Sequence, residues 1–363
     1  MPSRSITLLP QNGNASITTI NCGSSFSRLG GVVDVSAFLN LTNFTCNNNN
    51  ITEISGYSNN SNLITLSFVD NLLTESLPSL SGMTNLQEFK YNRNQISGSI
   101  PPSLSDLAAL RIFQGFNNAH TGSIPSLSSL VNLRIFQCDL NNLTGTIPAL
   151  NANTELTSFS CNSQRGATKL TGSIPSLAGL TNLLNFYCYN NQLSDFAGGS
   201  VSNKLGDFKA QNNLLPASAV DAILSAFVTA NKTTGTRILS LHGNGNASPT
   251  SVGVIKTTLS GTAFSRSDTT VTVNSTAHGY VTGDYVTVKD IAETDFQGTF
   301  AITRINDNTF QYTTLTTGAL TGSGTATLRK TSTGNTSGFR SYQNLALVSR
   351  TGGPWDININ FPA

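Results

Sequence analysis

The chain has 363 residues, of which 38% are hydrophobic and only 10% are charged, and its formal net charge is +2. This length predicts two domains or one elongated array. The near-neutral charge and the lack of Lys or Arg runs argue against nucleic acid or an anionic membrane as a partner. Apolar residues that recur at fixed intervals argue against disorder.

Residues 1–16 form an N-terminal arm ahead of the first recognisable repeat. They lack the basic start and the apolar core of a secretory signal, and no apolar run in the chain reaches transmembrane length. We therefore expect either that an export signal was removed or that the protein reaches the exterior by another route. Release of assembled virus particles is one such route.

A repeated unit then occupies most of the first 245 residues. A clear copy is LQEFKYNRNQISGSIP, with apolar residues at Leu86, Phe89, Tyr91 and Ile96. Its first apolar position recurs every 22 to 27 residues, at Ile17, Leu41, Leu63, Leu86, Leu110, Leu133, Leu156, Leu183 and Leu205. The fourth position is phenylalanine in seven of these nine copies, which predicts a stacked aromatic row in a core.

The order L-x-x-L-x-L-x-x-N-x-L followed by T/S-G-x-I-P resembles the leucine-rich repeat, in the variant typical of plant receptor ectodomains. The resemblance implies an α/β solenoid, a mostly parallel β horseshoe in which each repeat supplies one short strand. Prolines in the connecting segments predict short turns or 3₁₀ pieces on the other side. The repeated asparagine should form a ladder that bonds backbone groups of neighbouring turns, at Asn49, Asn71, Asn94, Asn118, Asn141, Asn191 and Asn213.

One repeat carries an insertion, SQRGATK, between Cys161 and Leu170, and its ladder asparagine is not where the template places it. We expect this segment to bulge from the solenoid as a loop. It is either a contact element, since loops often carry function, or a tolerated insertion.

Cysteine and histidine give no sign of catalytic or metal chemistry. All five cysteines, an odd number, occupy position six of a repeat, which predicts free buried thiols and no disulfide framework: Cys22, Cys46, Cys138, Cys161 and Cys188. His120 stands where other repeats have Leu or Ile, so we expect a core or edge histidine. His242 follows the expected last strand of the solenoid, and His278 lies in a turn of the C-terminal β-module. No catalytic motif is present. We predict no enzyme activity, no cofactor and no metal.

The solenoid, residues 17–247, should end in a helix and a strand that close its core. Apolar residues from Ala219 to Val228 follow helical spacing, with Ser218 as the cap, and 237–241 reads as the last strand. Residues 248–262 are rich in Ser, Thr and Gly and read as a linker.

Residues 263–330 have a period of two and predict a small β-sandwich or barrel, with strands at 270–275, 284–291, 298–305, 308–314 and 324–330. This string resembles a β-module of bacteriophage tail and other virion proteins, through His278, Gly279, Gly283, Asp284, Gly298, Phe300, Phe310, Tyr312 and Gly322. The segment 331–363 adds a strand at 342–348 and an apolar tail around Trp355. That tail either packs on the β-domain or docks on another subunit.

Positions three, five and seven of each repeat face away from the core, on the concave side of the sheet. Apolar and aromatic residues there, bordered by polar ones, predict a recognition surface for a glycan or a protein. The alternative is that these residues only stabilise the sheet. The predicted site residues are Glu88, Lys90, Asn92, Ile112, Gln114, Phe116, Ile135, Gln137, Asp139, Tyr187 and Tyr189.

The two resemblances together imply a non-enzymatic virion structural protein, a tail-fibre or capsid-decorating subunit on the virion surface. Its solenoid would bind a host-surface glycan or protein, and residues 263–363 would attach it to other virion subunits in an oligomeric particle. We expect no nucleic acid and no membrane insertion. The alternatives are a secreted or surface-anchored bacterial adhesin and a purely structural cement protein.

Overall fold

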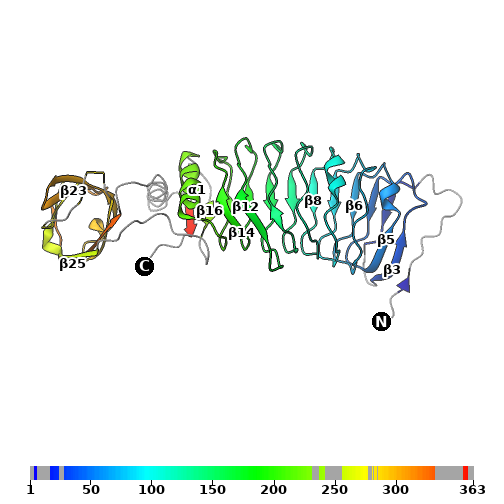
Figure 1. Ribbon diagram of the computed structural model, residues 1–363, viewed down its shortest axis with the longest axis horizontal. Helices are drawn as coiled ribbons and strands as arrows, with labels where there is room; N and C mark the ends of the chain where they lie inside the picture. The colour runs from blue at the N-terminus through cyan, green and yellow to red at the C-terminus, as the bar shows by residue number, and fades with distance from the viewer. Residues whose placement is uncertain are drawn as a thin grey trace. The chain divides into compact units, whose positions relative to one another are not determined.

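The computed structural model describes residues 4–5, 17–23, 28–230, 237–241, 256–276, 280, 282–283, 285–331 and 355–358 (Figure 1). The chain divides into two compact units. The first comprises Met1–Ser248 and Asn344–Ala363, and the second comprises Pro249–Gln343. The expected strand at 342–348, His242, His278, Gly279, Asp284 and most of the N-terminal arm lie outside the described residues.

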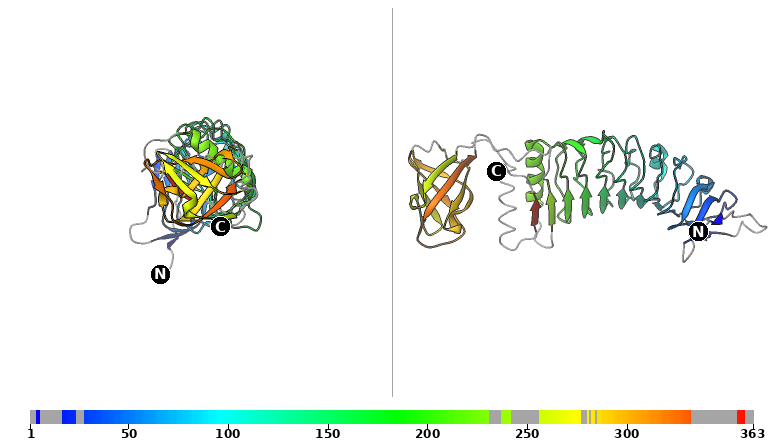
Figure 2. Two further views of the ribbon diagram at one scale, coloured as in Figure 1. Left: turned by 90° about the vertical axis from the view of Figure 1, so that its left-hand side faces the viewer. Right: turned by 90° about the horizontal axis from the view of Figure 1, so that it is seen from below.

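The first unit is a parallel β-solenoid, which confirms the predicted fold class. Most turns contribute a three-residue strand, and these strands lie side by side along one side of the unit (Figure 2, right). Within the described residues they form one parallel sheet of eleven strands: β2 (Thr19–Asn21), β4 (Asn43–Thr45), β6 (Thr65–Ser67), β7 (Glu88–Lys90), β8 (Ile112–Gln114), β9 (Ile135–Gln137), β11 (Ser158–Ser160), β13 (Asn185–Tyr187), β15 (Asp207–Lys209), β16 (Arg237–Ser240) and β26 (Trp355–Asn358).

The other side of the solenoid combines the expected 3₁₀ pieces with short strands that the repeat pattern did not predict. The 3₁₀ helices are η2 (Tyr57–Asn59) and η3 (Pro102–Asp106). These short strands pair in parallel because extended segments of successive turns lie side by side, with register shifts between Gly31 and Val32 and between Gly172 and Ser173. They are β1 (Arg4–Ser5), β3 (Leu29–Asp34) and β5 (Asn50–Ser55), and then β10 (Gly145–Thr146), β12 (Leu170–Ile174) and β14 (Gln192–Phe196).

Buried side-chain amides connect the turns just beyond the strands, as the repeated asparagine predicted. In Asn141, Oδ1 accepts a hydrogen bond from the His120 backbone N–H at 3.0 Å. Its Nδ2 donates to the backbone carbonyls of Gly115 at 3.0 Å and of Cys138 at 3.1 Å. The same pattern recurs at Asn94 and Asn118. Each amide thus satisfies buried backbone groups on its own turn and on earlier turns.

The insertion repeat keeps this ladder through a different residue. Gln164 accepts from the Leu143 N–H at 2.9 Å and donates to the carbonyls of Cys138 and Cys161 at 3.2 and 2.9 Å. The extra methylene of glutamine lets the amide reach the same groups from a displaced backbone. The ladder is therefore continuous through this turn, although the asparagine template misses it.

A row of phenylalanines fills the core behind the sheet, as predicted. From Phe113 to Phe208 the successive rings are stacked, with centroids 4.9 to 5.6 Å apart. Beyond them, Phe227 of α1 (Ala217–Thr229) packs edge-on against Phe208 at 5.3 Å and continues the row. Each of these rings is essentially inaccessible to solvent. Burial of apolar surface, as in this row of rings, is the main favourable contribution to the free energy of folding.

Three residues from neighbouring turns share one space in this core. A Cβ at Gly115 would lie 2.3 Å from the Tyr91 hydroxyl, so only glycine leaves room for that side chain. The Tyr91 hydroxyl lies 3.1 Å from His120 Nε2, and His120 Nδ1 lies 3.1 Å from the Gly98 carbonyl. Because a carbonyl only accepts, the proton is on Nδ1 and Nε2 accepts from tyrosine. His120 is thus the core histidine that the sequence predicted.

The cysteines are free thiols in the structure, and all but Cys22 are buried. Burial raises the pKa of Cys138, Cys161 and Cys188 above the usual thiol range. These three therefore act as small apolar core residues.

The helical cap is present, but Ser218 is not its capping residue. Helix α1 begins at Ala217, and the Pro216 carbonyl accepts the N–H groups of Ala219 and Val220. Ser218 therefore lies inside the first turn, and the chain enters the helix from proline.

The second unit consists of two antiparallel sheets around one apolar core, in agreement with the expected all-β domain. Two of its strands, β17 (Lys256–Ser260) and β18 (Phe264–Ser267), lie in or next to the segment 248–262 expected to be a linker. The first sheet has the strand order β17 (Lys256–Ser260), β25 (Gly324–Thr331), β20 (Tyr285–Ile291) and β21 (Gly298–Ala301). The second has the order β22 (Thr303–Asn306), β23 (Thr309–Thr313), β19 (Thr270–Asn274), β18 (Phe264–Ser267) and β24 (Leu320–Thr321). The unit also contains the 3₁₀ helices η4 (Gly261–Ala263) and η5 (Thr294–Phe296).

The end of the chain differs from both expectations for the tail. Strand β26 pairs in parallel with β16, aligning Trp355 with Arg237 and Asn358 with Ser240. The described residues of the tail, 355–358, thus add a strand to the solenoid, which neither expectation included. The physical reason is that β16 has an unpaired backbone edge, which an extended segment satisfies.

We expect Asn141→Ala to lower the free energy of unfolding by about 3 kcal/mol or more, because three hydrogen bonds to buried backbone groups are lost together. Asn132→Ala is the matched control, since exposed Asn132 makes one bond, to the Ala108 carbonyl at 3.0 Å. Urea unfolding followed by circular dichroism measures both. Equal losses in the two variants would contradict a special role for the ladder.

We also expect stability to depend on pH through His120. Burial lowers the pKa of its imidazole to about 4, whereas the unfolded value is about 6.5. Between these values the unfolded state binds a proton that the folded state does not, so stability falls by about 3 kcal/mol as pH drops from 6.5 to 4. The double variant Tyr91→Phe/His120→Leu should lose less stability between pH 7 and pH 4.5 in urea unfolding. The same pH dependence in both proteins would refute this assignment.

Candidate functional site

The outward side chains of the eleven-stranded sheet form a surface that we call the strand face. It consists of positions three, five and seven of the turns from Leu86 to Gln211. Strand pairing places these residues in rows that run along the solenoid axis. One row aligns Glu88 with Ile112 and Ile112 with Ile135, and the next aligns Lys90 with Gln114 and Gln114 with Gln137.

The structure brings the eleven predicted site residues together in two groups. Nine lie on the three consecutive turns of β7, β8 and β9, and Tyr187 and Tyr189 lie on the turn of β13. The turn of β11 separates the groups and carries the short side chains of Ser158 and of Ser160, of which Ser160 is only 4% exposed. Asn92, expected at the rim, is only 6% exposed and offers little surface to a ligand.

An interlocked cluster marks the end of the strand face nearest the cap. The Tyr187 hydroxyl donates to Asp207 Oδ2 at 2.8 Å, and Lys209 Nζ lies 5.0 Å from the centroid of the Tyr187 ring. Lys209 also pairs with Asp207 at 3.8 Å. Burial and the bond to Asp207 raise the pKa of Tyr187, so its hydroxyl stays protonated. The predicted set omits Asp207 and Lys209, although their register with Asn185 and Tyr187 brings them here.

Ion pairs neutralise both ends of the strand face. Glu88 and Lys90 are joined at 2.7 Å on one turn, and Asp207 and Lys209 form the corresponding pair near the cap. Gln114 donates to Gln137 at 2.7 Å between them. These contacts hold long side chains in fixed positions, which lowers the entropic cost of binding.

Asp139 is the exception to this pairing. It is half-buried, and within the described part of the chain no cation lies at ion-pair distance from it. Its side-chain partner is Ser160, whose Oγ lies 2.8 Å from Asp139 Oδ1. Burial raises the pKa of Asp139, and the bond from Ser160 offsets part of that effect. The carboxylate is thus held at the centre of the strand face at a cost in desolvation.

The insertion loop does not project freely. The Arg165 guanidinium donates to the Asn117 side chain, two turns back along the solenoid. On the other side, Lys169 Nζ donates to the Asn190 carbonyl at 3.3 Å, and Gln192 bonds the loop backbone at Lys169 and Ala167. Hydrogen bonds therefore hold the loop against the turns on both sides, so the expected bulge is fixed to the solenoid.

Two further findings concern chemistry and membranes. Among the described residues, no three His, Cys, Asp or Glu side chains gather as metal ligands. None of the helices described is long and apolar enough to span a bilayer.

Comparison with known proteins identifies the fold of the first unit. No family model matches the sequence, and no curated protein matches it. Among solved structures, the PEPR1–AtPEP1 complex has a TM-score of 0.50 at 19% identity, over 66% of this chain and 38% of that one. The leucine-rich repeat ectodomain of the Arabidopsis receptor kinase HAESA, with an IDA peptide hormone ligand, has a TM-score of 0.46 at 27% identity, over 52% of this chain and 33% of that one.

This chain thus spans well under half of either of these two chains. The similarity to PEPR1–AtPEP1 shows a shared fold. Together with the parallel strands, the amide ladder and the phenylalanine row, it establishes that the first unit is a leucine-rich repeat solenoid.

Proposed function

We propose that the protein is a non-enzymatic binding protein whose strand face binds an extended segment of a partner protein through a basic side chain. The proposal rests on Asp139, a half-buried carboxylate that has no cation at ion-pair distance among the described residues. The other two acids of the strand face, Glu88 and Asp207, are each paired with a lysine. A ligand Lys or Arg at Asp139 supplies the missing charge.

Apolar side chains on neighbouring turns also support the proposed binding of a partner protein at the strand face. Phe116 and Asp139 are adjacent in the row of position-seven residues, because the N–H of Asn117 bonds the Asp139 carbonyl at 2.9 Å. Ile112 and Ile135 lie side by side, and Tyr189 follows beyond the β11 turn. Half-exposed apolar and aromatic residues around one charge match the anchors found at the centres of protein interfaces.

The dimensions of the strand face set the length of the ligand. Six turns, from Glu88 to Asp207, stack at about 4.8 Å and span about 24 Å. An extended peptide of about seven or eight residues covers that distance at about 3.3 Å per residue. It would cross the strands, with a basic residue near its middle.

We further propose that the second unit displays the solenoid on a larger assembly, as a tail-fibre or capsid-decorating subunit of a virion. The support is the two-unit organisation together with the sequence resemblance of residues 263–330 to virion β-modules. Because β26 belongs to the solenoid, the attachment surface would be the second unit itself and not the tail. Many displayed copies would raise the avidity of a weak site.

We expect Asp139→Asn to increase stability at neutral pH. Burial raises the folded pKa of Asp139, so its contribution is favourable while it is protonated and is lost as pH rises through that folded pKa. The variant should be more stable than the natural protein at pH 7 in urea unfolding, and the difference should shrink as pH falls toward 3. A variant that is less stable at pH 7 would show that the carboxylate serves the fold.

The binding proposal is tested by selecting peptides of about eight residues from a random display library, with the full chain as bait. We expect enrichment of one central Lys or Arg, and loss of that preference with Asp139→Asn. Replacement of Phe116 or Tyr189 by alanine should weaken binding of the selected peptides by about tenfold, the effect of losing one interface anchor.

Glu155→Gln is the matched control, because it removes one negative charge from an exposed side chain that pairs with Arg134 outside the strand face. It should leave the selection unchanged. The proposal fails if no basic preference emerges, or if Asp139→Asn selects the same peptides as the natural chain.

A further inference from the structure

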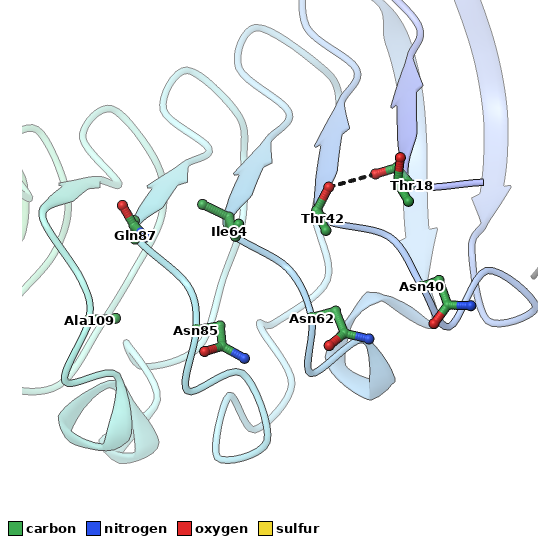
Figure 3. A pocket seen from close by; sticks show the side chains of 8 residues that line it. All are labelled: Thr18, Asn40, Thr42, Asn62, Ile64, Asn85, Gln87 and Ala109. Carbon is green, nitrogen blue, oxygen red and sulfur yellow. Dashed lines mark hydrogen bonds between the residues drawn. The ribbon is translucent and has the colours of Figure 1, made fainter. Parts of the chain in front are cut away.

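A second candidate surface lies on the same solenoid, at the ends of the strands where the chain enters the sheet. It is a groove of about 580 Å³ that crosses five successive turns (Figure 3). The residues immediately before β2, β4, β6 and β7 line it, together with the residues that lead into them. The lining consists of Thr18, Asn40, Thr42, Asn62, Ile64, Asn85, Gln87 and Ala109.

The chemistry of this groove differs from that of the strand face. Its eight lining residues include no charged and no aromatic side chain, and six of them carry a hydroxyl or a carboxamide. Ile64, 38% exposed, and Ala109 supply the apolar part. Such a lining offers nothing to a phosphate, to a basic peptide or to a planar ring. It suits an uncharged ligand with many hydroxyls and some C–H surface.

Two amides of the groove, those of Asn62 and Asn85, are held in one orientation by the preceding turn. Asn62 Nδ2 donates to the Leu39 carbonyl at 3.3 Å, and Asn85 Nδ2 donates to the Ser61 carbonyl at 3.0 Å. In Figure 3 the amide nitrogens of Asn62 and Asn85 point toward the preceding turn and their oxygens toward the next one. Because one N–H of each of these two amides is bonded to the preceding turn, their oxygens are fixed acceptors on adjacent turns.

On a later turn of the same chain, the side-chain oxygen of the equivalent asparagine accepts a hydrogen bond from a lysine. Asn182 occupies the equivalent position and makes the equivalent bond, to the Thr154 carbonyl at 3.3 Å. Its Oδ1 accepts from Lys204 Nζ at 2.9 Å, and Lys204 is the equivalent residue of the following turn. In the groove the residue that follows Asn85 in this series is Ala109, which carries no donor. Within the described part of the chain, Asn85 Oδ1 therefore has no side chain equivalent to Lys204 to bond it.

Threonine hydroxyls complete the set of polar groups. Thr42 Oγ1 donates to the Thr18 carbonyl at 3.0 Å, as the dashed line in Figure 3 shows, and accepts from Asn43 Nδ2 at 3.1 Å, so its oxygen has one further lone pair for a ligand. The Gln87 amide adds a donor at the same edge. Acceptors that repeat at about 4.8 Å, interspersed with donors, match a chain of sugar hydroxyls, each of which both donates and accepts.

We propose that this groove is a binding site for a neutral oligosaccharide, separate from the peptide site on the strand face. Sugar hydroxyls would donate to Asn62 Oδ1 and Asn85 Oδ1 and accept from Gln87, and a C–H face of the sugar would lie against Ile64 and Ala109. The glycan is favoured over a peptide because the lining has neither a charge nor a deep apolar pocket to distinguish side chains.

The test is isothermal titration calorimetry of the full chain with four uncharged oligosaccharides: cellohexaose, laminarihexaose, maltohexaose and chitohexaose. We expect at least one to bind. Ala109→Lys should weaken that binding by about tenfold or more, because the new ammonium group copies Lys204 and occupies the Asn85 acceptor. Asn85→Leu should have a similar effect, because it removes the acceptor.

Asn182→Leu is the matched control, since it changes the same position on a turn outside the groove, and it should bind like the natural chain. Urea unfolding checks that all three variants are folded. Asp139→Asn should not alter the sugar affinity, which separates this site from the strand face. The proposal is overturned if none of the four sugars binds at about 10 mM, the weak end of measurable affinity. It is also overturned if Ala109→Lys binds unchanged, or if the groove variants impair peptide binding instead.

Discussion

The solenoid depends on one buried amide per turn. A three-residue strand pairs only the backbone groups within it, and the chain must then turn inside a dry core where unpaired N–H and C=O groups are costly. Amides such as Asn118 and Asn141 supply one acceptor and two donors at that point. The geometry requires a left-handed residue just before the amide. Even Leu140, with φ of 55°, adopts it, at a backbone cost that the ladder offsets.

The side chains at the inward positions of the first unit therefore form the amide ladder and the phenylalanine row, or fill space left by a small residue on a neighbouring turn. Gly115 illustrates such a match, because the Tyr91 hydroxyl from the previous turn occupies the space of its missing side chain. His120, on the same turn as Gly115, then satisfies that hydroxyl. Neighbouring turns thus compensate for one another, and a substitution at one of these three positions changes what the other two can be.

The outward positions do not have to fit a core, and two surfaces of different chemistry lie on the outside of the solenoid. The strand face combines apolar anchors with neutralised ion pairs and one unmatched carboxylate, Asp139. The groove at the strand entrances contains oriented amides and hydroxyls and has no charge. Because each turn adds the same position to the same row, a short repeat converts a few side-chain types into extended surfaces. The two proposed ligands, a basic peptide and a neutral glycan, follow from this difference.

The sequence by itself determined the repeat period, the positions of the strands, the aromatic row, the amide ladder and the two-part organisation, because each depends on residue spacing along the chain. It also identified the residues of the strand face, since side-chain alternation in a strand is local. Only the tertiary structure decided the rest. In the structure Gln164 takes the place of the missing ladder asparagine, and β26 pairs with β16. Ser158 and Ser160 separate the strand face into two groups, and Asp139 has no cation at ion-pair distance among the described residues. These features depend on which groups meet across turns about two dozen residues apart, and on the direction in which each amide and carboxylate points, which no spacing along the chain specifies.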